Sequence, residues 1–179
     1  MVDGPSSLPP RDPRAAGHVN SRTDGLLLLG AVLRSGTAAG LAMIPFAAVF
    51  RAKGLRINEY GRKTLELLIG DVASPLREVL MFAQHLLISC LAALPLLLIL
   101  GRVAGRRRRI LAGAAYGAGF YVAINSLILP LAFGDPTPWR LGLSTVAPSL
   151  FIHLVYGVVL GLTAPVNLPT ATAAARPRR

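Results

Sequence analysis

Four long apolar stretches, separated by segments rich in arginine, are the feature that most constrains how this chain folds. They lie at about 26–50, 79–100, 110–133 and 145–164. Each is close to or above the roughly 20 residues that an α-helix needs to cross a bilayer core. Charged residues are only 15% and hydrophobic residues 53% of the 179 residues, which is unusual for a soluble domain. The sequence therefore predicts an all-α integral membrane protein, a four-helix bundle.

Basic residues set the expected orientation. The loop between the second and third stretches holds no acid but several arginines: Arg102, Arg106, Arg107, Arg108 and Arg109. Lysine and arginine in short loops mark the cytoplasmic side of a membrane. We therefore expect a multi-pass membrane protein with both termini cytoplasmic. The same arginines are expected to contact the bilayer through anionic lipid headgroups, so the net charge of +11 needs no nucleic-acid partner.

Polar segments flank the transmembrane domain, which is expected to occupy residues 25–164. Residues 1–24 are rich in proline and lack an apolar period, and residues 165–179 are polar and basic. Both are expected to be disordered tails. The first stretch follows a long polar lead and continues into a basic segment, so it is predicted to be a retained helix and not a cleaved signal.

A longer loop, residues 51–78, lies on the outer side in this topology. Asn58 is placed as a helix cap, and the apolar residues after it fall near one face, which predicts a short amphipathic helix: Tyr60, Leu65, Leu68, Ile69 and Val72. Ser74 and Pro75 are then expected to be the cap and first residue of the second span. The loop is interpreted as a connector, with a docking or lid element as the alternative.

Glycines four residues apart occur in three of the stretches. The pairs are Gly36 with Gly40, Gly113 with Gly117, and Gly157 with Gly161. Lipid is as apolar as a leucine side chain, so helices in a membrane are held together by close backbone approach at small residues. The pairs predict tight packing, either inside one bundle or between copies of the chain.

The two halves of the chain form a weak parallel repeat of two helical hairpins. Each half has a proline near the far end of its first helix, Pro45 or Pro130, and a proline followed by a histidine in its second. The histidines are His85 and His153. Because the two helices that carry them run in the same direction, both imidazoles can lie at a similar depth.

These histidines are interpreted first as groups that hydrogen-bond across helices. Two alternatives stay open. One is substrate or proton handling, with Asn125 and Tyr156 as further polar residues of possible function. The other is ligation of haem by His85 and His153, since neutral imidazole is a good ligand for iron. No other metal site or cofactor is expected, because two histidines are too few for a closed zinc site.

No catalytic constellation is evident in the sequence. The acidic residues lie in loops or tails, so no nucleophile–histidine–acid set is predicted. Motifs of phosphate-binding loops, dinucleotide sites and metalloproteases are missing. Cys90 is the single cysteine and is interpreted as a packing residue inside the second span.

The segment 110–162 resembles the YagU-like family of small four-helix bacterial inner-membrane proteins. The similarity rests on LAGAAYGAGFYVAINSLILPLAFG and FIHLVYGVVLGL: a glycine-rich third helix ending in a proline, then a helix with a histidine before YG and a further glycine. The matching positions are Gly113, Gly117, Pro130, His153, Tyr156, Gly157 and Gly161. The resemblance implies a four-helix architecture in the bacterial inner (plasma) membrane and no defined biochemical activity.

Three functional hypotheses follow from these features. The preferred one is a non-enzymatic structural or accessory subunit in a homo-oligomer or a larger membrane complex. The first alternative is a small oligomeric transporter or channel. The second is a haem-binding electron carrier that uses His85 and His153.

Overall fold

The computed structural model describes residues 13–57 and 60–166, with side chains from residue 23 onward. Within these ranges the chain is helical and has no strand. The helices are α1 (Pro13–Ala52), α2 (Tyr60–Ile69), α3 (Ser74–Leu100), α4 (Arg106–Phe120), the π-helix η1 (Tyr121–Ile128), α5 (Leu129–Phe133), α6 (Pro138–Leu141) and α7 (Leu143–Thr163). The prediction of an all-α bundle is confirmed.

Four helical segments are long and apolar enough to cross a membrane. They are Thr23–Ala52, Ser74–Leu100, Arg106–Phe133 and Leu143–Thr163. The predicted spans agree except at their ends. Helix α3 starts at Ser74, five residues before the predicted apolar stretch, because a count of apolar residues leaves out the charged Arg77 and Glu78 near its start. Its cap is Ala73, so the prediction of Ser74 as the cap was wrong by one residue.

Helix α1 corrects the boundary of the N-terminal tail. The helix begins at Pro13, so the expectation of disorder over residues 1–24 is wrong for residues 13–24. Proline suits the first turn of a helix, and extending an existing helix by one residue avoids the cost of nucleation. Residues 1–12 and 167–179 of the predicted tails lie outside the described residues.

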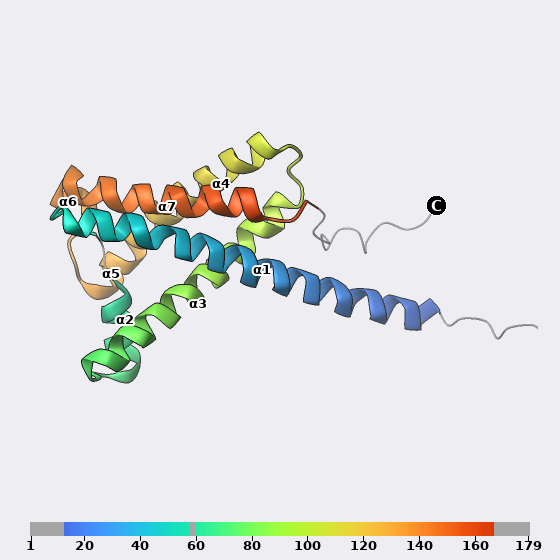
Figure 1. Ribbon diagram of the computed structural model, residues 1–179, viewed down its shortest axis with the longest axis horizontal. Helices are drawn as coiled ribbons and strands as arrows, with labels where there is room; N and C mark the ends of the chain where they lie inside the picture. The colour runs from blue at the N-terminus through green and yellow to red at the C-terminus, as the bar shows by residue number, and fades with distance from the viewer. Residues whose placement is uncertain (1–12, 58–59, 167–179) are drawn as a thin grey trace, which may run out of the picture.

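Both ends of the membrane domain lie at the same end of the bundle (Figure 1). At this end the carbonyl oxygen of Thr163, in α7, accepts a hydrogen bond from Ser35 Oγ of α1 at 3.2 Å. Arg109, in the first turn of α4, donates to the carbonyl of Ala164 just after α7. We name this the arginine end and the opposite one, with α2 and α6, the loop end.

In each of the two hairpins, α1–α3 and α4–α7, the helix backbones approach each other closely at glycines. The α4–α7 pair is the most extensive in the bundle, and α1 packs against both α3 and α7. A Cβ built on Gly113 would lie 2.9 Å from the carbonyl carbon of Gly157 and closer still to its oxygen. A Cβ on Gly36 would lie 2.6 Å from the Cα of Cys90 in α3. Because these neighbours are backbone atoms, no larger side chain fits without separating the helices.

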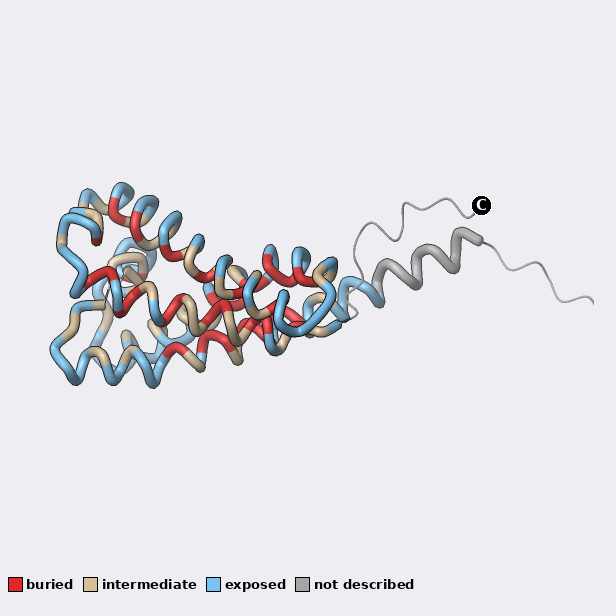
Figure 2. The backbone as a smooth tube through the Cα atoms, turned by 90° about the horizontal axis from the view of Figure 1, so that it is seen from above, coloured by how far each residue is buried: buried red, intermediate tan, exposed pale blue. Residues whose placement is uncertain are grey.

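Burial follows the inward faces of the long helices (Figure 2). The most buried apolar residues join α1, α3 and α7 into one core, including Ala39, Ala93, Leu96, Leu97, Leu100 and Leu160. Large apolar side chains on the outward faces are exposed, such as Leu91 at 63% and Leu131 at 73%. In water such a surface favours aggregation, whereas lipid is an apolar solvent for it. The fold is therefore that of a multi-pass membrane protein.

Candidate functional site

The third span contains a π-helix, η1, between α4 and α5. A π-helix has wider turns than an α-helix, and such turns are frequent at functional sites. The available signal in the sequence is Pro130, which lacks an N–H and clashes with the carbonyl of the residue four positions earlier, here Ser126. A wider turn relieves this clash. Sequence reasoning noted Pro130 in the repeat and in the family resemblance, and it missed the π-helix.

Asn125 of η1 forms a hydrogen bond with His153 of α7. The Asn125 Nδ2 atom lies 2.9 Å from His153 Nε2, and His153 Nδ1 lies 2.6 Å from the carbonyl oxygen of Ser149. A carbonyl only accepts, so Nδ1 carries a proton and donates it. The amide Nδ2 only donates, so Nε2 must accept. These two bonds together describe a neutral imidazole with its proton on Nδ1.

Aromatic rings enclose this histidine. The ring centroids of Phe120 and Tyr121 lie 6.1 and 5.4 Å from that of His153. His153 is only 9% exposed. Nearby in η1, the hydroxyls of Tyr121 and Ser126 are buried and form no hydrogen bond of normal geometry with any described group. We name the set Tyr121, Asn125, Ser126, Ser149 and His153 the π-site.

His85 has a different environment in α3. Its Nε2 lies 3.0 Å from the carbonyl oxygen of Gly40 in α1, and its side chain is partly buried. Among the described residues, no hydrogen bond joins His85 to His153 or to Asn125. The structure therefore gives each histidine its own partners, although the sequence repeat made the two equivalent.

This donor set does not favour haem. A ligand to iron needs a free lone pair on one ring nitrogen, and the one such lone pair of the His153 ring, on Nε2, accepts the bond from Asn125. Within residues 23–57 and 60–166, no group of three or more histidine, cysteine, aspartate or glutamate side chains is placed to hold a metal ion. Haem ligation by His85 and His153 stays an untested prediction.

Other polar groups in the spans bond to the backbone of neighbouring helices. The Tyr116 hydroxyl donates to the carbonyl of Ala92 at 2.6 Å, and the Tyr156 hydroxyl donates to that of Ser89 at 2.5 Å. Cys90 is buried and lies 3.6 Å from Thr37 Oγ1, measured from its sulfur. These contacts join α3 to α4, α7 and α1, so Tyr156, which the sequence singled out, links two helices.

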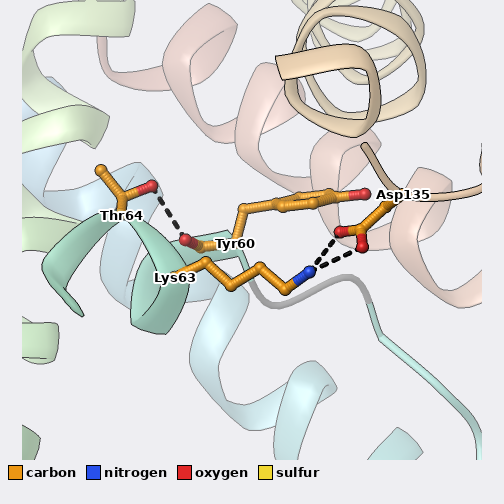
Figure 3. Close-up of polar contacts among 4 residues, drawn as sticks. All are labelled: Tyr60, Lys63, Thr64 and Asp135. Atoms are coloured by element: carbon orange, nitrogen blue, oxygen red, sulfur yellow. Dashed lines mark hydrogen bonds and ion pairs between the residues drawn. The ribbon is translucent and has the colours of Figure 1, made fainter. Parts of the chain in front are cut away.

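Helix α2 is attached to the loop end of the third span (Figure 3). Lys63 Nζ lies 2.7 and 2.5 Å from the two carboxylate oxygens of Asp135. The Tyr60 ring stacks on the ring of Phe133, with centroids 5.8 Å apart. Burial raises the pKa of the Tyr60 hydroxyl, and the carboxylate of Asp135 raises it further. We name Tyr60, Lys63, Phe133 and Asp135 the α2 clip. It connects the first hairpin to the second.

The predicted helix in this loop is present, but it ends at Ile69, before Val72, and its apolar face is only partly buried. Leu65 is buried, whereas Leu68 and Ile69 are 71% and 51% exposed. Only part of the apolar face of α2 therefore packs against the rest of the protein. Asn58, the expected cap, lies outside the described residues.

Neutralising Asp135 is expected to loosen α2. A partly exposed ion pair contributes up to about 1 kcal/mol, so Asp135→Asn should raise the tryptic cleavage rate at Lys53 and Arg56 by about fivefold in detergent. Arg62→Gln removes the exposed pair with Glu66, 3.7 Å apart, and is the matched control without effect. If trypsin cleaves Asp135→Asn as slowly as the wild type, the α2 clip does not hold this helix.

No protein-family model, curated protein or solved structure matches this chain. The similarity of residues 110–162 to the YagU-like family therefore stays a prediction. The function has to be argued from the geometry described above.

Proposed function

We propose that the protein is a non-enzymatic helical subunit of the bacterial inner membrane. It acts by packing against a second membrane chain, either another copy or a larger partner. The observation that supports this role is the use of the polar side chains inside the spans. His85, Tyr116 and Tyr156 each contact a backbone carbonyl of a neighbouring helix. Groups that are bonded in this way hold helices together and are not free to bind a substrate.

Helix α3 supplies the surface for such a partner. It packs mainly against α1 and contacts α2, α4 and α7 much less. In Figure 1 it diverges from α7 toward the loop end. Exposed apolar residues recur along its outward side every three or four positions, which places them on one face: Leu76, Val79, Ala83, Leu87, Leu91, Leu94 and Leu98. We name these residues the α3 stripe.

Cysteine cross-linking in native membranes tests this proposal. In a Cys90→Ala background, Leu87→Cys or Leu91→Cys on the α3 stripe is expected to yield an adduct of higher mass in most of the protein. Leu111→Cys on α4 is the matched control, because Leu111 is also exposed, at 59%, but lies off the α3 stripe. Monomers alone at all three positions would contradict the proposal.

A second candidate is a small oligomeric transporter, and the π-site is the observation that favours it. A π-helix, a His–Asn pair and the buried hydroxyls of Tyr121 and Ser126 are together unusual within a span. Proton flux into liposomes that is lost in His153→Gln would support a transporter. Liposomes that stay impermeable to protons, sodium and small solutes would remove this candidate.

A further inference from the structure

A hollow of about 530 Å³ lies at the arginine end of the bundle. It is bounded by residues 101–105, the start of α4 and the end of α7. Arg102, Arg106 and Arg109 line it, and no acidic side chain of the described residues does. Val103, Leu162 and Val166 add apolar walls. The hollow therefore combines positive charge with apolar surface.

Arg109 differs from the other arginines of this loop. It is only 7% exposed, whereas Arg102 and Arg106 are exposed. Its Nη2 atom donates to the carbonyl oxygens of Ala164 and Pro165, and its Nε atom is buried with no hydrogen-bond partner among the described groups. No described carboxylate forms an ion pair with it.

A buried guanidinium without a counter-charge is costly. Arginine stays charged at any pH at which proteins fold, so it cannot avoid this cost by losing a proton. Two carbonyl dipoles compensate it only in part, since buried charges are normally paired. An anion in the hollow would supply the missing counter-charge and an acceptor close to the unused donor.

The start of α4 adds further donors. The N–H of Arg109 makes the bond to Gly105 that begins the helix, at 3.1 Å. The preceding N–H groups, from Arg106 to Arg108, therefore have no acceptor within the helix. The N-terminus of a helix also carries a partial positive charge, which favours anions. α4 has 15 residues and continues into η1, so this effect is fully developed.

We propose that this hollow binds the phosphate group of an anionic phospholipid. Arg102, Arg106 and the start of α4 contact the phosphate, and Arg109 provides the buried charge behind it. An acyl chain lies along Leu162 and Val166. Inorganic phosphate shares the charge but not the apolar part, which makes the lipid the better fit. The first turn of a span is also the depth at which headgroups lie. The inference is independent of the proposed subunit role.

Lipid titration of the full-length protein in neutral detergent tests this site. Phosphatidylglycerol is expected to bind and to raise the thermal unfolding temperature, whereas phosphatidylcholine is not. The double variant Arg102→Gln/Arg106→Gln should bind phosphatidylglycerol about tenfold more weakly, because it loses two charge-assisted contacts. Arg107→Gln/Arg108→Gln is the matched control. It removes the same charge from the same segment, but neither residue lines the hollow, so its affinity should stay within about twofold of the wild type.

Arg109 is tested separately. Arg109→Lys should retain more binding than Arg109→Gln, and if either variant fails to fold, the two double variants decide. An equal loss in both double variants would overturn the site, because only the overall charge would then matter. Binding without preference for phosphatidylglycerol over phosphatidylcholine would also overturn it. If inorganic phosphate at the same concentration stabilises the protein as strongly, the phosphate chemistry is supported and the lipid as its source is overturned.

Discussion

Replacing Gly157 by leucine is expected to separate α4 from α7 and to prevent recovery of folded protein. A Cβ on Gly157 would lie 2.7 Å from the carbonyl carbon of Gly113, closer to its oxygen, and 3.1 Å from the nitrogen of Gly117. These are backbone atoms of a helix, so they move only if the whole helix moves. Overpacking a core commonly costs about 1–3 kcal/mol, and a leucine in backbone contact should exceed that range. Thermal unfolding and the monodisperse yield in detergent measure the effect.

Gly119 offers the matched control for this prediction. It lies in α4 like Gly113 and Gly117, but a Cβ on it would meet no atom within 4 Å. Gly119→Leu should therefore leave stability unchanged or raise it, because leucine has a higher helix propensity than glycine by up to about 1 kcal/mol. Equal losses in Gly157→Leu and Gly119→Leu would contradict close packing as the reason for these glycines.

The sequence predicted the spans well because their signal is local. An apolar run long enough to cross a bilayer needs no knowledge of its neighbours, and neither does a spacing of four between glycines. What a glycine pair contacts is not local. Gly113 lies against Gly157, another glycine of such a pair, whereas Gly36 lies against Cys90, which the sequence marked only as a packing residue. Which residue each glycine contacts depends on how the two helices of its hairpin pack together.

The candidate sites depend on contacts between residues that are far apart in the sequence. Lys63 and Asp135 of the α2 clip are separated by 72 positions, and no pattern relates them. Within the arginine loop, Arg107, Arg108 and Arg109 look equivalent as a run of charges. Only Arg109 is buried, because it belongs to the side of α4 that faces α7. Sequence reasoning assigned all of them to headgroups and could not single out one.

The two histidines should differ in their contribution to stability. His153→Ala is expected to lower the free energy of unfolding by about 2–4 kcal/mol, since it removes a buried ring and leaves Asn125 without its partner. His85→Ala should cost about 1 kcal/mol or less, because the His85 ring is partly exposed and forms one hydrogen bond with a described residue, to the carbonyl of Gly40. Unfolding of both variants in the same detergent measures the difference.

A double-mutant cycle tests whether the larger loss of stability in His153→Ala comes from the hydrogen bond with Asn125 in the π-site. Asn125→Ala combined with His153→Ala should cost less than the sum of the two single losses, by about 0.6–1.7 kcal/mol, because both remove the same interhelical bond. Equal costs at His85 and His153 would contradict the separate environments and agree with the equivalence that the repeat suggested. A dithionite-reduced absorption spectrum tests the haem hypothesis directly. A haem band that is lost in both His85→Ala and His153→Ala would mean that the two imidazoles bind iron, and that His153 Nε2 gives up its hydrogen bond with Asn125 to do so.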